Sequence, residues 1–354
     1  MKILVVGDWH SELHEEAVYQ AFLQLGHEVS RFAWHLYFKP VGFFYKLIKP
    51  VIKAQNKYML GHIVDKLNKD FLEKAILEKP DLIFIYRGTH IYVKTLKHLR
   101  ALLPITILVG YNNDDPFSPL YPKWKWRHFL GCIPEYNLVL AYRLHNINEF
   151  KLAGARRVEL LRSWFMPERN YPIQLTQQEY DKFGCDVVFI GHYENDGRLE
   201  YFDKLADAGI HFRIYGPEWH KAPLRPWLTK MGKILPVRGQ DYTRVLCASK
   251  IALCFFSRLN RDTYTRRVFE IPATATMMLS EYTDDLSTLF IEDKEAVFFR
   301  SPSELVAKVE RYLADDQLRM NIAQAGYKKV TDSGHDIISR MKQVLTWSEQ
   351  IQGD

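Results

Sequence analysis

The run Asp186-Val187-Val188-Phe189-Ile190-Gly191 is a short apolar stretch that ends at a glycine. An amphipathic stretch over 198–208 follows it, and a second apolar run over 211–215 is closed by Gly216. Strand, helix and strand in this order are typical of a parallel sheet that helices cover. The spacing therefore predicts a βαβ unit at the start of the C-terminal half.

The same alternation continues through the rest of that half and also fills the N-terminal half. Further helices and strands are expected at 241–249, 251–256, 267–274, 277–280, 296–299, 302–313 and 316–329. In the N-terminal half, strands are expected at 3–7, 28–32, 82–86, 106–109, 138–141 and 158–161. Each half reads as a Rossmann-like unit, which predicts an α/β fold with two parallel sheets.

A helix is expected between the first two strands of the N-terminal half. Ser11 can cap the start of this helix, and Gly26 can end it. Negative charge from Glu12, Glu15 and Glu16 suits the positive end of the helix dipole. The chain therefore starts with a βαβ unit.

The length of 354 residues is too great for one hydrophobic core and fits two domains. The stretch 163–180 contains Pro167 and Pro172 and little periodicity, so we interpret it as a linker. We place an N-terminal domain at 1–165, the linker at 166–182, a C-terminal domain at 183–335 and a C-terminal helix at 336–354.

The composition is that of a globular protein. Hydrophobic residues make up 47% and charged residues 25%, which argues against a disordered or fibrous chain. The net charge of +6 suits anionic partners, but no dense Lys/Arg stripe indicates nucleic acid. The four cysteines show no CxxC spacing and are expected to be reduced core residues rather than metal ligands. No apolar stretch reaches the roughly 20 residues that span a bilayer, so we expect a cytoplasmic protein.

In open parallel sheets, ligands bind beyond the carboxyl ends of the strands. This rule points to the loops that follow Gly7, Tyr86, Val109, Gly191, Gly216 and Phe256. The dinucleotide fingerprint GxGxxG is absent after both first strands, which argues against hydride transfer. Arg198, near a helix start after Gly191, can meet a diphosphate there, and its alternative role is that of a solvated surface cation.

A candidate carboxylate stands at the front of the helix expected near 267–274. Glu270 can accept two hydrogen bonds from a ribose diol without a metal ion. Asp262 lies eight positions earlier, where it can reach sugar hydroxyls from the preceding loop. An acid pair with this spacing also arises by chance.

Several runs in the C-terminal half are similar, in order, to one known family. They are Val188-Phe189-Ile190-Gly191, Arg198, Ile214-Tyr215-Gly216-Pro217-Glu218-Trp219, Arg267-Val268-Phe269-Glu270-Ile271-Pro272-Ala273, Met278-Leu279-Ser280-Glu281-Tyr282-Thr283, Leu289-Phe290, Glu295-Ala296-Val297-Phe298-Phe299 and Ala323-Gln324-Ala325-Gly326-Tyr327. Over residues 186 to 335 the chain resembles the C-terminal domain of the CgeB-type (spore maturation protein) glycosyltransferases. These look like relatives of retaining glycosyltransferase family four.

The resemblance implies the GT-B architecture, in which two Rossmann-like domains face each other. It implies a nucleotide-sugar donor in the C-terminal domain and, in the N-terminal domain, an acceptor that is a glycan, a lipid-linked sugar or a protein. A sugar would pass from a nucleoside diphosphate to an acceptor hydroxyl with retention of configuration and with no metal ion or other cofactor. Cell-envelope polysaccharide synthesis is the setting that we expect.

The resemblance also implies which residues contact the donor. They are Gly191, Arg198, Tyr215, Gly216, Arg267 and Glu270. Glu270 matches the second acid of the family-four E-x7-E motif, which holds the ribose. Asp262 stands in the place of the first acid, and Ala275 stands where relatives carry glycine.

Two further candidate catalytic sites lie in the N-terminal half. In Tyr111-Asn112-Asn113-Asp114-Asp115-Pro116, one carboxylate can bind acceptor hydroxyls while the other serves as base if burial raises its pKa. We rank Asp115 first as that base, and the alternative is an ordinary Asp-Pro turn. His10 lies on the first loop, where some GT-B enzymes keep an acceptor-side base, and its alternative role is structural.

The segment 38–53 interleaves aromatic and aliphatic residues with lysines and contains no acid. This pattern suits a surface that contacts anionic lipid at the inner face of a membrane. Its alternative is an ordinary helix packed on the N-terminal domain, with its lysines facing water.

Two rival functions share the predicted fold. One is a nucleotide-sugar epimerase, which needs no separate acceptor. The other is a non-catalytic module that senses a sugar or nucleotide, an alternative suggested by the departures at Asp262 and Ala275.

Overall fold

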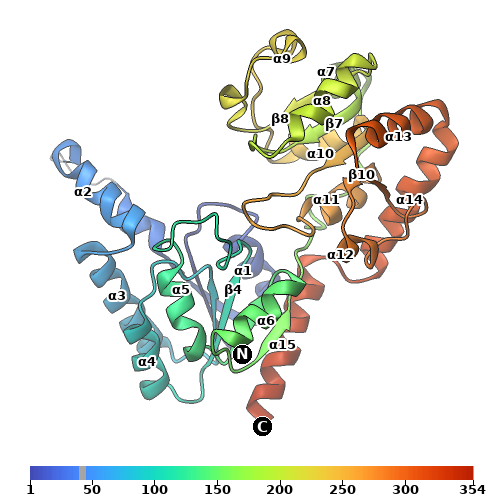
Figure 1. Ribbon diagram of the computed structural model, residues 1–354. Helices are drawn as coiled ribbons and strands as arrows, with labels where there is room; N and C mark the ends of the chain where they lie inside the picture. Colours follow the sequence, from blue (N-terminus) through green and yellow to red (C-terminus); the bar gives the residue numbers. More distant parts are fainter. Residues whose placement is uncertain (40–44, 354) are drawn as a thin grey trace. The chain divides into compact units, whose positions relative to one another are not determined.

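Each half of the chain forms a parallel β-sheet in the computed structural model, which describes residues 1–39 and 45–353 (Figure 1). Unit 1 comprises Met1–Arg162 and Ile337–Asp354, and unit 2 comprises Ser163–Asp336. The stretch 166–182, predicted as a linker, is thus part of unit 2. The last helix, α15 (Ile337–Gly353), is part of unit 1.

The described part of unit 1 has a six-stranded sheet in the order β2-β1-β3-β4-β5-β6. Its strands are β1 (Lys2–Gly7), β2 (Glu28–Ala33), β3 (Leu82–Tyr86), β4 (Ile107–Asn112), β5 (Leu138–Ala141) and β6 (Val158–Leu160). Its remaining helices are α1 (Glu15–Gln24), η1 (Trp34–Phe38), α2 (Tyr45–Tyr58), α3 (His62–Glu78), α4 (Val93–Leu102), α5 (Arg127–Cys132), η2 (Ile133–Glu135) and α6 (Leu144–Leu152).

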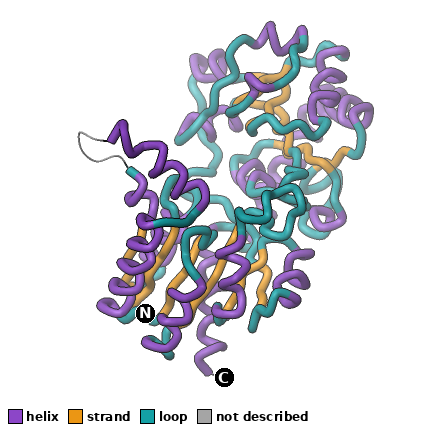
Figure 2. Tube along the Cα trace, turned by 60° about the vertical axis from the view of Figure 1, so that its left-hand side comes forward, coloured by secondary structure: helices purple, strands orange, loops and turns teal. Residues whose placement is uncertain are grey.

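Helices cover both faces of this sheet, which is why its central strands are apolar along their whole length (Figure 2). On one face, the buried side chains of Ile83 and Ile85 join a core with Phe71 of α3 and Leu96 of α4. On the other face, Phe22 of α1 packs against Phe84, with ring centroids 6.1 Å apart. The helix α15 packs beside α1.

The described part of unit 2 has a five-stranded sheet in the order β11-β10-β9-β7-β8. Its strands are β7 (Cys185–Ile190), β8 (Phe212–Tyr215), β9 (Ser249–Cys254), β10 (Met277–Glu281) and β11 (Val297–Phe299). Its helices are α7 (Gln177–Phe183), α8 (Arg198–Asp207), η3 (Trp219–Lys221), α9 (Pro226–Met231), α10 (Gln240–Cys247), α11 (Arg267–Ala273), α12 (Asp284–Ser287), α13 (Pro302–Ala314) and α14 (Asp316–Asp332).

Every strand expected from the apolar runs is present, with ends that differ by at most a few residues. The predicted cap of the first helix is wrong, because α1 begins at Glu15 and its N-cap residue is His14. The Ser11 hydroxyl instead accepts a hydrogen bond from the Leu13 N–H group within the loop. Glu12 consequently precedes the helix, while Gly26 follows its end with a φ of 83°.

The helix α7 begins inside the predicted linker and ends one residue beyond it. Thr176 and Glu179 form a capping box, in which each side chain accepts a hydrogen bond from the other residue's backbone N–H group. Local capping therefore starts a helix where apolar periodicity is weak.

The four cysteines are free thiols, and Cys132, Cys185 and Cys254 are buried, as expected of core residues, whereas Cys247 is half-buried. Among the described helices, none combines the length and the hydropathy that crossing a bilayer requires. Of the segment 38–53, residues 40–44 lie outside the described residues, and Tyr45 begins α2.

Candidate functional site

Both sheets have a switch point, where successive connections leave a pair of neighbouring strands in opposite directions. In unit 1 it lies between β1 and β3, and in unit 2 between β7 and β9. The loops at the carboxyl ends of such strand pairs form a crevice for ligands. The loops predicted after Gly7 and Tyr86, and after Gly191 and Phe256, follow these strands.

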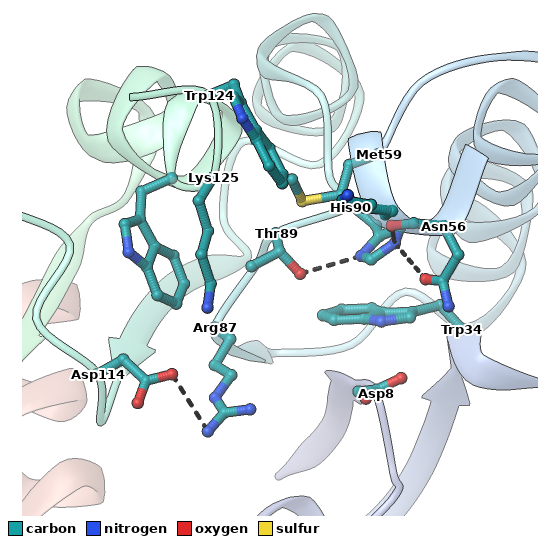
Figure 3. Close-up of a pocket in the computed structure, with 12 residues that line it drawn as sticks. Asp8, Trp34, Asn56, Met59, Arg87, Thr89, His90, Asp114, Trp124 and Lys125 are labelled. Atoms are coloured by element: carbon teal, nitrogen blue, oxygen red, sulfur yellow. Dashed lines mark hydrogen bonds and ion pairs between the residues drawn. The ribbon is translucent and has the colours of Figure 1, made fainter. Parts of the chain in front are cut away.

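A cavity of about 350 Å³ opens at the switch point of unit 1 (Figure 3). Charged and aromatic side chains line it: Asp8 after β1, Arg87 after β3, Asp114 after β4, and Lys125, Trp34, Trp124 and Trp126. His90 also lines it, and burial lowers the pKa of His90 to about 4. His90 is therefore a neutral wall of the cavity at neutral pH.

Arg87 and Asp114 form an ion pair inside this cavity, with 3.3 Å between Nη2 and Oδ2. The Nε atom of Arg87 also donates to Oδ1 of Asn113 at 3.0 Å. Arg87 has a φ of 63°, a left-handed conformation that costs a non-glycine residue about 1–2 kcal/mol. Strain of this kind persists where the surroundings fix it, as at binding sites.

The loop after β1 carries a second ionic pair, in which His10 Nδ1 lies 2.8 Å from Asp8 Oδ2. The hydrogen bond to Asp8 raises the pKa of His10, although burial opposes it. Beneath the loop, the buried Glu15 side chain accepts a hydrogen bond from the Asp8 N–H group at 2.9 Å. A Cβ atom at Gly7 would overlap Glu15, so glycine is needed there.

The structure overturns the ranking of the adjacent acids Asp114 and Asp115. Asp115 is completely buried, and its Oδ1 accepts hydrogen bonds from the Phe117 N–H group and the Asn146 amide. It organises the turn and cannot touch a substrate, whereas Asp114 lines the cavity. The sequence could not separate the two, since neighbouring side chains in a loop point in directions that the pattern does not encode.

Asp115, His145 and Glu149 also lie close enough together to hold a metal ion, with ligand atoms within 4.8 Å of one another. The Asn146 amide nitrogen, however, donates to Asp115 at 3.0 Å and to Glu149 at 2.7 Å. The amide thus stabilises both carboxylates from a position between them.

In unit 2, the predicted residues Gly191, Gly216 and Arg267 come together at the carboxyl ends of β7 and β8. A Cβ atom at Gly216 would overlap the Gly191 carbonyl oxygen, and one at Gly191 would lie 3.2 Å from Arg267 Nη2. The Tyr215 carbonyl accepts a hydrogen bond from the Gly191 N–H group at 2.8 Å. Among the residues that the structure describes, the Arg267 guanidinium has no hydrogen bond or ion pair, so it can meet an anion.

Glu270 lies one turn after Arg267 on α11 and is 5% exposed. Its Oε2 accepts a hydrogen bond of 2.8 Å from the Tyr242 hydroxyl. Burial and the charge of Glu270 raise the pKa of Tyr242 well above its usual value, so Tyr242 stays a donor. Within the described structure, the Oε1 atom of Glu270 accepts no hydrogen bond, which leaves it able to receive a ligand hydroxyl.

Asp262 has a different partner from Glu270. It closes a turn with Ser257. The Asp262 N–H group donates to the Ser257 carbonyl at 2.9 Å, and the Asp262 carboxylate accepts from the Ser257 N–H group at 3.4 Å. Ala275 follows α11 with a φ of 54°. Glycine adopts this left-handed conformation more readily than alanine does.

The surroundings of Arg198 exclude one of its two interpretations. The side chain is 4% exposed, which excludes a solvated surface cation. It forms two bonds to Asp196, of 2.8 Å from Nε and 2.5 Å from Nη2, and its Nη1 donates to the His192 carbonyl at 2.8 Å. Arg198 therefore holds the loop after β7, and its predicted contact with a diphosphate requires these bonds to open.

Sequence reasoning missed several residues of these sites. Tyr242 lies 28 positions before Glu270, and Lys125 and Trp34 lie in irregular or short elements, so no periodic pattern indicates them. Arg87 carried a usable signal, since the pair Arg87-Gly88 directly follows a buried strand at the carboxyl edge.

Comparison with known proteins adds a family match and a set of fold relatives. Residues 198–346 match the family model described as glycosyl transferase-like. The search of curated proteins gave no match.

Three solved structures show the likeness in fold. HepE from Anabaena, in complex with UDP and glucose, has a TM-score of 0.67 and 13% identity, with coverage of 99% of this chain and 100% of that chain. Sucrose-phosphate synthase from Thermosynechococcus elongatus has a TM-score of 0.66 and 10% identity, with 99% of each chain covered. A protein from Listeria monocytogenes, described as a UDP-N-acetylglucosamine 2-epimerase, has a TM-score of 0.56 and 10% identity, with coverage of 97% and 94%.

The solved structures establish the GT-B fold, and the family match in the C-terminal part indicates the activity. The chain is a glycosyltransferase with two Rossmann-like units.

Proposed function

We propose that this enzyme transfers a sugar from a nucleoside diphosphate to an acceptor hydroxyl. The observation that carries the proposal is the pairing of the buried Glu270 with Tyr242 beside the unpaired Arg267. Oε1 of Glu270 accepts hydrogen bonds from the ribose hydroxyls, while Tyr242 fixes the orientation of the carboxylate.

Arg267 and the glycines at 191 and 216 supply the diphosphate site. The guanidinium neutralises the charge that develops on the leaving diphosphate, and the absence of side chains lets phosphate oxygens approach the backbone. Since a guanidinium does the work that a divalent ion does in other transferases, we propose a reaction without a metal ion. Full activity in excess EDTA is the expected result.

Resemblance to family four supports retention of configuration, and we propose a CgeB-type transferase on the same ground. A specific observation favours a second candidate, which is inversion. The His10–Asp8 pair has the form of a general base held by a carboxylate, and inversion requires such a base on the acceptor side. The anomeric configuration of the first product, measured by NMR, decides between the two.

The acceptor is proposed to bind unit 1, and α2 to contact an anionic membrane surface. In α2, Ile48 and Val51 are 48% and 56% exposed, and the helix contains lysines and no acid. Figure 1 shows α2 extending away from the sheet of unit 1. This geometry suits a lipid-linked acceptor.

The test of the proposed function starts from a thermal-shift panel of UDP-, GDP-, dTDP- and CDP-sugars, because a ligand that binds only the folded state raises its melting point. Glu270→Ala should abolish transfer and weaken binding of the nucleotide that raises the melting point in this panel. Glu200→Ala removes an exposed carboxylate from the first turn of α8 and is the matched control. Unchanged nucleotide affinity in Glu270→Ala would overturn the site assignment.

The epimerase alternative predicts turnover of the donor alone. A transferase incubated with its nucleotide-sugar in the absence of acceptor gives only slow hydrolysis. Formation of an epimer under these conditions would overturn the transferase proposal in favour of the epimerase.

A further inference from the structure

The wall of the unit 1 cavity includes hydrogen-bond donors that have no acceptor among the described residues. The indole N–H groups of Trp34 and Trp126 are buried, and neither finds an acceptor among the described residues. These tryptophans are 1% and 2% exposed, so water is not an easy substitute partner. Buried N–H groups are nearly always satisfied in folded proteins, and a ligand in this cavity is one source of the missing acceptor atoms.

Two cations add to these unpartnered donors. Arg87 uses Nε and Nη2 for Asn113 and Asp114, which leaves Nη1 without a partner in the described part of the chain. Lys125 points toward Arg87 (Figure 3), and its Nζ has no hydrogen bond or ion pair among the described residues. The ammonium group lies over the rings of Tyr121 and Trp126, 4.4 and 5.2 Å from their centroids. Burial lowers the pKa of Lys125, and the charge of Asp114 opposes this shift.

The negative charges of the cavity are already engaged. Asp114 pairs with Arg87, and Asp8 pairs with His10. Arg87 and Lys125 point toward one another in this cavity, and Asp114 is the carboxylate that pairs with Arg87. A bound oxyanion would compensate the second cation and accept from the free N–H groups at the same time.

Aromatic rings form the rest of the wall. Trp124 packs against Tyr58, with centroids 5.2 Å apart, and Trp34 lies against His90 at 5.5 Å. Such flat indole faces suit the apolar face of a pyranose ring. Oxyanion recognition and a ring-binding wall thus occur in the same cavity.

We propose that this cavity binds the acceptor through an anionic group, a phosphate or a carboxylate, carried on a sugar ring that packs against Trp124. Arg87 and Lys125 hold the anion, and the indole N–H groups of Trp34 and Trp126 complete its hydrogen bonds. The inference rests on the transfer reaction proposed above, because only a transferase needs an acceptor site.

The experiment is a titration of the full chain, monitored by tryptophan fluorescence, with the nucleotide site first saturated by the nucleotide found in the panel. The probes are glucose, glucose 1-phosphate, glucuronate and inorganic phosphate. At least one of the two anionic sugars should bind tenfold or more tightly than glucose, and the preferred one identifies the anion as phosphate or carboxylate. Equal affinity for glucose, or inorganic phosphate binding as tightly as both anionic sugars, would overturn the proposal.

Two variants locate the anion. Lys125→Met should weaken the preferred anionic sugar about tenfold and leave glucose unchanged. Lys123→Met, an exposed lysine on the same loop, should change neither and is the control. Trp34→Phe keeps an aromatic ring and removes one N–H group, so it should lower the affinity for the preferred anionic sugar. This variant tests the anion site independently if Lys125→Met does not fold.

The outcomes separate this inference from the proposed function. Tight nucleotide binding with no preference for anionic sugars removes the inference and leaves the transferase in place. If the unmodified protein binds no nucleotide at all, the proposed function itself is overturned.

Discussion

His10 Nδ1 lies 2.8 Å from Asp8 Oδ2 in the loop that follows β1. Asp8 lines the cavity of unit 1, and the two side chains remain 36% and 48% exposed, so a ligand can reach them. A histidine that donates from Nδ1 to a carboxylate presents Nε2 as a proton acceptor. The geometry of the pair thus presents the His10 imidazole as a general base, whichever reaction the enzyme catalyses.

The first prediction concerns the pH dependence of transfer. A histidine base acts only when neutral, so kcat/KM should rise with pH through the pKa of His10, which Asp8 raises above its usual value. Asp8→Asn removes the carboxylate and should move this acidic limb to lower pH. His10→Ala should abolish the limb and lower the rate about 100-fold, while His62→Ala on α3 should leave the profile unchanged. An unaltered profile in His10→Ala would show that His10 is not the base.

The second prediction concerns Arg198, whose side chain and that of Asp196 are 4% and 8% exposed. Removing one partner of a buried ion pair costs about 3–5 kcal/mol, so Arg198→Met should destabilise unit 2 by this order. Lys221→Met breaks an exposed pair with Glu218 and should cost less than about 1 kcal/mol. Chemical denaturation measures both. If folded Arg198→Met also lost nucleotide affinity, Arg198 would be a donor contact after all.

The third prediction concerns Gly216. Gly216→Ala should destabilise unit 2 by about 3 kcal/mol, because the new methyl group overlaps the Gly191 carbonyl. Gly209→Ala is a matched control, since Gly209 has a φ of 71° but open space around it. It should cost only about 1–2 kcal/mol for the left-handed conformation. Equal melting temperatures of the two variants would contradict the close approach of the two loops.

The fourth prediction concerns α2 and is measured by vesicle flotation. The protein should bind vesicles rich in phosphatidylglycerol and not vesicles of phosphatidylcholine, and salt should weaken the binding. Ile48→Asn with Val51→Asn should remove most of it. Leu77→Asn with Leu152→Asn changes two leucines that are 83% and 81% exposed elsewhere on unit 1, and should have no effect. Binding that survives the α2 substitutions would place the contact on another surface.

The sheet of each unit was predictable because its strands are buried on both faces and therefore appear as unbroken apolar runs. Leu82–Tyr86 is completely buried and coincides with the expected range. Helix starts were less predictable, since capping depends on side chains that compete. Glu15 folds back over Gly7 and begins α1 four residues after the expected cap, Ser11.

The candidate sites were predictable only as sets of loops. The carboxyl-edge rule selected the loops that carry Asp8 and Arg87, but it could not show that Asp114 faces the cavity and Asp115 does not. The family resemblance pointed to Glu270 but carried no information on Tyr242. Contacts between side chains far apart in the sequence need the tertiary structure.

Unit 1 draws on both the first and the last parts of the described chain, because α15 packs beside α1. During synthesis on the ribosome, its sheet emerges first but waits for the closing helix until all of unit 2 has been made. Unit 2 is contiguous and can fold as soon as it leaves the exit tunnel. The half that begins first is thus completed last, and the side of α1 that packs against α15 stays exposed in the interval.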